Sequence, residues 1–193
     1  MKAVQRSPWW WVPTLYFGQG IPYFAVMSLS LVMYKNTGFS NTEIALYTSW
    51  LYLPWVIKPL WAPVVEMFGT KRQWTVALQG LTGVALALVA FTTHLPTFFQ
   101  ASLAVLWLMA FSSATHDIAA DGYYMLALPQ KEQAAYVGVR STFYRLANIT
   151  GPGALVALAG ILITRTGDPR TAWSIVFGLL GVVFALLCAW HFF

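Results

Sequence analysis

The chain has 193 residues, of which 59% are hydrophobic and only 9% are charged, and its mean hydropathy is +0.63. Soluble domains carry about 25% charged residues, so the composition excludes an ordinary soluble protein and indicates an integral membrane protein. The net charge of +5 comes from scattered basic residues, which argues against nucleic-acid binding. The single cysteine, Cys188, excludes an intrachain disulfide and a cysteine-based zinc site.

Six apolar stretches can each cross a hydrocarbon layer of about 30 Å as a helix. We predict spans at about 9–34, 43–65, 74–93, 98–126, 135–164 and 173–193. The connections between them are short. Residues 1–193 are therefore predicted to form a single all-α domain, a bundle of six transmembrane helices in a lipid bilayer.

Local signals refine the first two spans. Glycines and a proline at 18–22 predict an interruption of the first span, which a membrane tolerates where the freed backbone lines a cavity or packs on a neighbour. Ser40 or Asn41 is predicted to cap the second span, with Glu43 in its first turn.

An even number of spans places both termini on one side of the membrane. With cytoplasmic termini, the inner segments hold Lys2, Arg6, Lys71, Arg72 and Lys131. The outer segments then hold Lys35, Arg165 and Arg170. The excess of cations on the inner side favours cytoplasmic N- and C-termini.

The run HDIAADG, residues 116–122, places ionisable side chains within the fourth span. A charge at the centre of a membrane helix costs ~2.5–3.5 kcal/mol on insertion scales, so it usually marks a substrate or ion path. Asp117 and Asp121 are four residues apart and share one face of a helix. This face is the candidate substrate and proton-coupling site.

The fourth and fifth spans are predicted to run antiparallel about a turn near residue 131. Residues whose numbers sum to about 262 then share a depth, which places Asp117 beside Arg145 and Asp121 near residue 141. A buried carboxylate requires a cation at its own depth. We therefore expect Arg145 to pair with the aspartates, either as a structural clamp or as part of a functional site.

Two further cations belong to this candidate site. Arg140 and Arg145 differ by about 140° around a helix and cannot face one partner, so Arg140 is expected to point to the cavity or the cytoplasmic interface, or to snorkel. Lys58 lies at a similar depth and either joins the cluster or snorkels.

The roles of His116 and Gln19 stay open at this stage. His116 fits either a packing residue or a proton carrier. Gln19 fits either a hydrogen bond to the broken backbone around it or a contact with ligand. Of the two aspartates, Asp121 is the better candidate for a titrating group, because it is less closely matched in depth to Arg145.

Catalytic motifs are weak. The sequence has no G-x-x-x-x-G-K loop for phosphates and no H-E-x-x-H, and we expect neither enzymatic activity, nor a metal, nor a cofactor. Ser112, His116 and Asp117 resemble a triad, but adjacent residues diverge by about 100° on a helix, so Asp117 cannot easily orient the His116 ring.

The turn APVVEMFGTKR, residues 62–72, resembles the loop between the second and third helices of major facilitator transporters, whose pattern is G-x-x-x-D-x-x-G-x-[RK]. Glu66, Gly69 and Lys71 fit the pattern, and Arg72 follows it. Ala62 stands where the family has glycine. The resemblance implies that this loop takes part in conformational change.

Four runs together resemble AmpG-type muropeptide permeases and the related acetyl-CoA transporters. They are YFGQGIPY, KPLWAPVVE, AFSSATHDIAADGYYMLALP and FYRLANITGPG. In that group the fourth helix carries [QH]-D-I-x-x-D, the second a Lys before L-W-x-P, and the fifth Y-R-x. Asp117, Asp121, Lys58 and Arg145 occupy those positions, whereas Arg140 lies outside the pattern.

The resemblance implies a secondary transporter of the bacterial inner membrane that imports anhydro-muropeptides with protons. Such transporters have about twelve helices in two halves, so the chain resembles an N-terminal half, and a C-terminal half or a second copy is an expected partner. The alternatives are a carrier of acetyl-CoA or another solute, and a non-transporting, truncated membrane fragment.

Overall fold

The computed structural model describes residues 7–192, and this part of the chain is helical throughout, with short turns. The α-helices are α1 (Val12–Phe24), α2 (Ser30–Asn36), α3 (Asn41–Thr48), α4 (Leu53–Ile57), α5 (Ala62–Met67), α6 (Lys71–Thr92), α7 (Phe98–Ala127), α8 (Gln130–Thr166) and α9 (Pro169–Phe192). Within the described residues, five helical stretches are long and apolar enough to cross a membrane: Pro8–Asn36, Lys71–Thr92, Phe98–Ala127, Gln130–Thr166 and Pro169–Phe192. The chain is an all-α, multi-pass membrane protein.

The first span is continuous through 18–22, so the predicted interruption at this place is wrong. Gly20 instead lets α1 approach α8, because a Cβ on Gly20 would lie 2.9 Å from the Ala147 Cβ and 3.1 Å from the Tyr144 carbonyl oxygen. The irregularity follows Pro22, as a π-helical turn over Ala25–Leu29 that joins α1 to α2.

The second predicted span is built from short pieces. Helices α3, α4 and α5 alternate with 3₁₀ turns at Ser49–Tyr52 and Lys58–Leu60. Prolines stand in the first turn of α4, of the second 3₁₀ turn and of α5, where their missing N–H costs least. The predicted cap at Ser40 is confirmed, since Ser40 and Glu43 form a reciprocal capping box at the start of α3.

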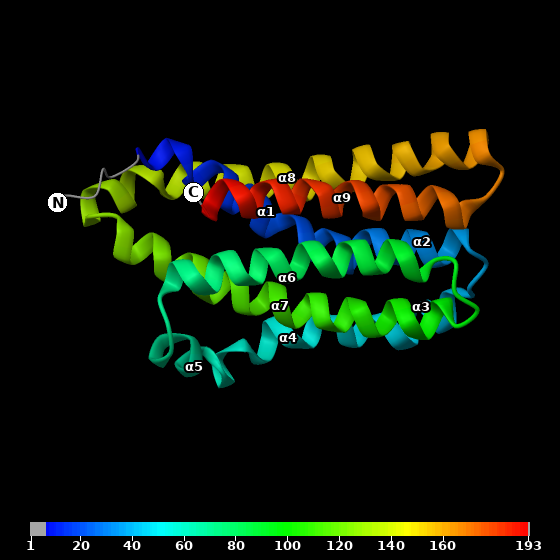
Figure 1. Cartoon of the computed structure of the whole chain (residues 1–193), viewed down its shortest axis with the longest axis horizontal. Helices are drawn as coiled ribbons and strands as arrows, with labels where there is room; N and C mark the ends of the chain where they lie inside the picture. The colour runs from blue at the N-terminus through cyan, green and yellow to red at the C-terminus, as the bar shows by residue number, and fades with distance from the viewer. Residues whose placement is uncertain (1–6, 193) are drawn as a thin grey trace.

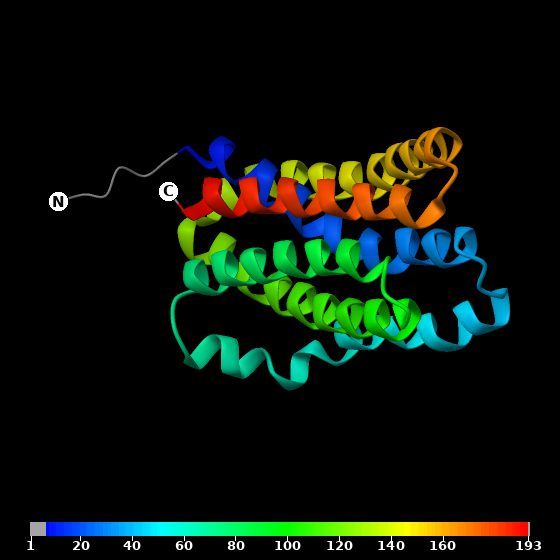
Figure 2. The same ribbon diagram turned by 45° about the vertical axis from the view of Figure 1, so that its right-hand side comes forward.

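The bundle places α8 and α9 on one side, the broken segment α3–α5 on the opposite side, and α6 and α7 between them (Figures 1 and 2). Small residues bring α6 and α9 together. A Cβ on Gly181 would lie 3.3 Å from the Ala87 nitrogen and 3.4 Å from the Gly83 carbonyl oxygen. Such close backbone approach is the usual means by which helices associate in a bilayer.

The start of α1 and the end of α9 lie at one end of the bundle, which we call the terminal end (Figure 1). Trp10 stacks on Trp190 there, with ring centroids 5.5 Å apart. The turn between α7 and α8 and the loop between α5 and α6 lie at the same end (Figure 1). Lys2 and Arg6, which belong to the prediction of orientation, lie outside the described residues.

Candidate functional site

Asp117 and Asp121 lie one turn apart in the terminal-end half of α7, as the sequence predicts. The Asp117 side chain is 13% exposed, and its Oδ2 lies 3.8 Å from the Nζ of Lys58. Lys58 begins the 3₁₀ turn between α4 and α5, so the break in the second segment positions the ammonium group beside α7. Of the two positions that the sequence leaves open for Lys58, the structure shows the one beside Asp117.

Asp121 is held more tightly than Asp117. Its Oδ1 accepts hydrogen bonds from Arg140 Nη2 at 2.8 Å and from the Tyr16 hydroxyl at 2.9 Å. The Arg140 guanidinium also lies over two aromatic rings, 4.6 Å from the Tyr16 centroid and 5.0 Å from that of Tyr124. Charge-assisted hydrogen bonding and cation–π attraction thus fix this group across α1, α7 and α8.

The predicted pairing of Arg145 with the aspartates is wrong. Arg145 is exposed, and it forms no ion pair within residues 7–192, whereas Arg140 faces Asp121. The depth expected from residue numbers agrees with the structure, because it placed Asp121 level with residue 141, next to Arg140 in the chain. The rotation of α8 decides which arginine turns toward α7, and this rotation depends on the packing of α8 against α1 rather than on hydropathy.

Gln19 and His116 lie on different sides of the site. Gln19 is buried in α1, within interaction range of Asp117. His116 is only 3% exposed, lies within electrostatic range of His191 of α9, and has no partner for its Nε2 among the described residues. The structure therefore groups Gln19 with the charged pairs and places His116 in the interior of the bundle.

Rings from two segments form an aromatic cluster near Lys58 and Asp117, a grouping that the sequence does not predict. Tyr23 packs edge-on against Trp55 with centroids 5.3 Å apart, and Tyr52 stacks on the same Trp55 at 6.4 Å. Tyr144 of α8 lies near Asp117 and near both tyrosines. Aromatic residues are common throughout this chain, so their number does not single out these rings. Tyr16 and Tyr23 share one side of α1 with Gln19, and this spacing is the sequence feature that indicates a shared surface.

The loop between α5 and α6 joins three helices. Lys71 pairs with Glu66, and its Nζ donates to the Val65 carbonyl oxygen at 3.0 Å. Its aliphatic stem lies against Gly122 of α7, where an added Cβ would come within 2.9 Å of the Lys71 Cε. The loop thus anchors the start of α6 beside the HDIAADG run.

The two other residues of the predicted loop motif shape this loop and tie it to the end of the chain. Gly69 has φ +70°, a conformation that favours glycine. Arg72 donates to the Phe192 carbonyl oxygen at 2.7 Å, which links the loop to α9. The four residues together connect α5, α6, α7 and α9.

We define the charged face as Tyr16, Lys58, Asp117, Asp121 and Arg140. It combines two carboxylates with two cations at membrane depth, in a chain whose described residues contain no group of three or more potential metal ligands. Such a face can bind an anionic or zwitterionic solute, and it can exchange an internal ion pair for a contact with that solute.

Comparison with known proteins gives a consistent result. The family model described as the BT1 family matches residues 19–191. The anhydromuropeptide permease of Escherichia coli K12 is 31% identical over 151 residues, which cover 74% of this chain and 30% of the permease. An uncharacterised protein of Haemophilus influenzae is 27% identical over 176 residues, 87% of this chain and 40% of that protein.

An uncharacterised protein of Schizosaccharomyces pombe is 27% identical over 154 residues, 74% of this chain and 29% of that protein. The chain thus spans only 29–40% of the length of these relatives. No solved structure matches the chain.

Proposed function

Since this chain belongs to the BT1 family of membrane transporters, we propose that it forms the N-terminal, six-helix half of a secondary transporter that imports anhydro-muropeptides together with protons. The permease of Escherichia coli supports the substrate class, because it is 31% identical to this chain over 151 residues, 74% of its length. The proposed location is the bacterial inner membrane, with both termini in the cytoplasm, on the side with more basic residues.

The observation that carries the proposal is the pair of acid–base contacts on one face of α7. The Lys58–Asp117 contact at 3.8 Å is loose, whereas Arg140 and Tyr16 hold Asp121 at 2.8 and 2.9 Å. Ionisable side chains within a membrane-spanning helix are expensive to retain for structure alone. In this proposal the Lys58–Asp117 pair separates during transport, whereas the Arg140–Asp121 pair stays intact and holds the helices together.

Substrate binding follows from the chemistry around Lys58. A muropeptide carries carboxylates and sugar rings, so the Lys58 ammonium binds a carboxylate and the adjacent rings of Tyr23 and Trp55 pack against a sugar face. The Lys58 side chain is 36% exposed, which leaves it accessible to a solute.

Proton coupling follows from the partner of Lys58. When the ammonium group turns to the substrate, the Asp117 carboxylate is left buried without its cation and takes up a proton, because an unpaired charge at this depth is unfavourable. When substrate leaves, Lys58 returns and the proton is released. This proposal assigns titration to Asp117 in place of Asp121, since the Arg145 pairing that favoured Asp121 is absent.

A second six-helix unit completes the transporter in this proposal. Helix α8 has only Ala147 and Ala159 buried, and exposes Val137, Leu146, Ile149 and Ile161. The segments matched make up only 40% and 30% of two relatives, which supports a C-terminal half as the partner. A second copy of the chain is the alternative. The substrate would then lie between the two units, near the bilayer midplane.

The first experiment measures uptake of labelled anhydro-muropeptide into membrane vesicles that contain the protein as the cell produces it. We expect a proton gradient to drive accumulation, and Lys58→Gln to reduce uptake about tenfold, the effect of losing a hydrogen bond to a charged group. Competition by unlabelled muropeptide but not by acetyl-CoA supports the proposed substrate. Competition by acetyl-CoA alone would assign the other carrier class, and no uptake of either would support a non-transporting membrane protein.

The second experiment separates substrate binding from proton coupling. Asp117→Asn is expected to retain exchange of labelled for unlabelled substrate while losing accumulation driven by a pH gradient. Asp121→Asn is the matched variant, one turn away on α7, and is expected to retain its response to the gradient in whatever protein remains folded. If Asp121→Asn uncouples transport and Asp117→Asn does not, the assignment of the titrating residue is reversed.

A further inference from the structure

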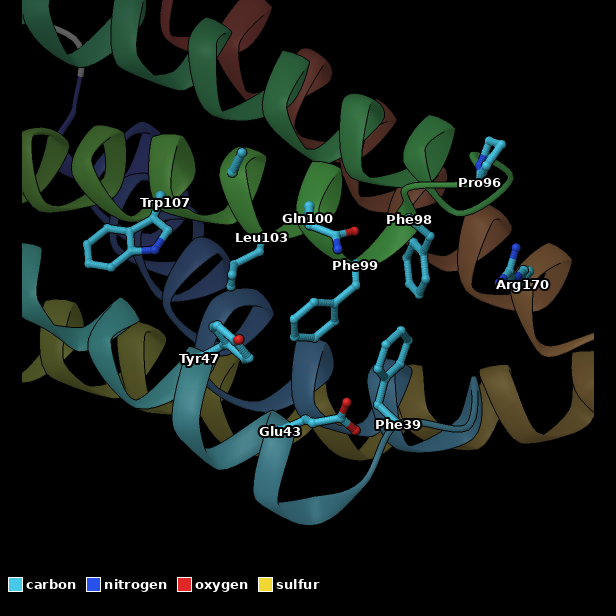
Figure 3. Close-up of a pocket in the computed structure, with 11 residues that line it drawn as sticks. Phe39, Glu43, Tyr47, Pro96, Phe98, Phe99, Gln100, Leu103, Trp107 and Arg170 are labelled. Carbon is cyan, nitrogen blue, oxygen red and sulfur yellow. The ribbon is translucent and has the colours of Figure 1, made fainter.

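A separate cavity opens at the end of the bundle opposite the terminal end (Figure 3). Its volume is about 620 Å³, and it lies between α3 and α7, with the start of α9 at its rim. None of the residues of the charged face lines it. The proposed transport function leaves this cavity unexplained.

Aromatic rings form the wall of the cavity. Phe39 stacks on Phe99 with centroids 4.6 Å apart, Tyr47 meets the same Phe99 edge-on at 5.4 Å, and Phe98 lies 6.1 Å from Phe39. Trp107 extends the wall about two turns beyond Phe99 along α7. The faces of such rings attract cations as well as apolar groups.

Two opposite charges border these rings. Glu43 lies on α3, and Arg170 lies at the start of α9, with its guanidinium 5.6 Å from the centroid of Phe98. In Figure 3, Phe39 and Phe98 lie between the two charged side chains. Within the part of the chain that the structure describes, neither side chain takes part in an ion pair. The cavity is therefore suited to a ligand that carries both a cation and an anion.

The position of the cavity relates it to the membrane surface. Phe39 comes from the turn between α2 and α3 and Pro96 from the turn between α6 and α7, and Phe98 and Arg170 stand in the first turns of α7 and α9, where the spans end. Aromatic side chains at this level of a membrane protein contact lipid headgroups. A zwitterionic ligand present at this depth in the bilayer is a phospholipid.

We propose that this cavity binds the headgroup of a zwitterionic phospholipid with a primary amine, that is, a phosphoethanolamine headgroup. Arg170 binds the phosphate, and the ammonium group donates hydrogen bonds to Glu43 and lies against the aromatic rings. Glu43 Oε2 already accepts from Ser40, which leaves Oε1 for the ligand. A trimethylammonium headgroup has no N–H to donate, and a glycerol headgroup has no cation, so both fit less well.

The test is native mass spectrometry of the purified protein titrated with phosphatidylethanolamine, phosphatidylcholine and phosphatidylglycerol of identical acyl chains. The wild type is expected to bind phosphatidylethanolamine about fivefold more tightly than either other lipid, the upper range for an exposed ion pair. Equal binding of phosphatidylcholine or phosphatidylglycerol by the wild type would overturn the proposal.

Two variants test the two charges separately. Glu43→Gln keeps the capping box, because an amide oxygen accepts from Ser40 as a carboxylate does, and it is expected to abolish the preference for phosphatidylethanolamine over phosphatidylcholine. Arg170→Gln is expected to weaken the binding of all three phospholipids about fivefold. Arg165→Gln, an exposed arginine near the same turn but outside the cavity, is the control and leaves all three affinities unchanged.

The proposal fails if Glu43→Gln preserves the preference in a variant whose melting temperature matches that of the wild type. Soluble phosphoethanolamine at the same concentration is expected not to displace the lipid, since it lacks the acyl chains. Displacement at equal concentration would show that the cavity recognises a free solute and would overturn the assignment to lipid. None of these measurements requires transport, so they are independent of the proposed function.

Discussion

The molecule holds its helices together in two different ways. In the close-packed seams, between α6 and α9 at Gly83 and Gly181 and between α1 and α8 at Gly20, backbones approach until there is no room for a side chain. On the charged face, α1, α7, α8 and the broken second segment meet through carboxylates and cations that are 13–43% exposed. The atoms nearest these three glycines belong to the backbone or to side chains that do not titrate.

This difference indicates which contacts can change during function. Dispersion contacts in a seam depend on shape alone, so neither pH nor a solute can alter them. Ion pairs on the charged face can be broken by a proton or replaced by a contact with a charged solute. A transporter needs both kinds of contact, because rigid units must move relative to one another around a site whose contacts are exchanged.

Breaking a seam should have the largest effect on stability. Gly20→Ala places a Cβ 2.9–3.1 Å from the Ala147 Cβ, the Asn148 amide nitrogen and the Tyr144 carbonyl oxygen. Because one of these atoms is backbone, α8 must shift, and we expect a loss of about 1–3 kcal/mol in the free energy of unfolding. Unfolding of the purified protein in mixed micelles with increasing denaturing detergent measures this loss.

The matched control is Gly160→Ala in α8, where a Cβ meets nothing within 4 Å. Alanine favours a helix over glycine by up to ~1 kcal/mol, so this variant should be unchanged or slightly more stable. Equal destabilisation by the two substitutions would mean that the α1–α8 seam is not close-packed.

The tight pair of the charged face should have an intermediate effect. Asp121 and Arg140 have side chains that are 43% and 29% exposed, so their coupling should resemble that of a surface pair, about 1 kcal/mol, and not the larger value of a buried pair. A double-mutant cycle with Asp121→Asn and Arg140→Gln measures it by the same unfolding assay. A coupling near zero would indicate that Tyr16 alone positions the carboxylate.

Replacing Arg145, the arginine that does not face the aspartates, should have almost no effect on stability. Arg145→Gln removes a charge that is exposed and forms no ion pair in residues 7–192, so the free energy of unfolding should stay within about 0.5 kcal/mol of the wild type. The same assay compares it directly with Arg140→Gln. A larger loss for Arg145→Gln than for Arg140→Gln would support the pairing expected from the sequence.

The sequence predicted what depends on hydropathy and short-range chemistry. The five long helical stretches begin and end within about five residues of the predicted spans, and the capping box at Ser40 and Glu43 lies where the residue types place it. The depth of the carboxylates along α7 also follows from residue counting, as does the proximity of Lys58 to them. These features are fixed by neighbours in the chain or by distance from a turn.

Features that depend on the rotation of a helix were not predictable in this way. Arg140 and Arg145 differ in facing rather than in depth, and facing is set by contacts such as Gly20 against Ala147. Whether residues 18–22 interrupt the first helix depends in the same way on what packs against them. The aromatic cluster at Tyr23 and Trp55 joins residues from two segments. Only the folded structure brings these residues together.

A contact that short-range chemistry fixes completely should affect stability only at acidic pH. Asp168 precedes α9, and its carboxylate accepts from the Thr171 hydroxyl at 2.6 Å and from the backbone N–H groups of Arg170 and Thr171. The hydrogen bond from Thr171, followed by those from the backbone, lowers the pKa of Asp168 below its ordinary value of 3.8. Because the pKa of Asp168 is lowered in the folded protein, the contact stabilises the protein at pH values above the ordinary pKa. This stabilisation is lost as the pH falls through the lowered pKa.

Melting temperatures of the wild type and of Asp168→Asn, measured from about pH 6 down to about pH 3, test this contact against the pairs of the charged face. Asparagine also caps a helix but does not titrate, so the difference between the two proteins should be constant near neutral pH and should shrink at the acidic end. A difference that stays constant over the whole range would mean that Asp168 keeps its ordinary pKa. Because this cap lies far from Lys58 and Asp117, it should change the acid stability of the bundle without changing the response of transport to a pH gradient, and that independence separates a structural carboxylate from a coupling one.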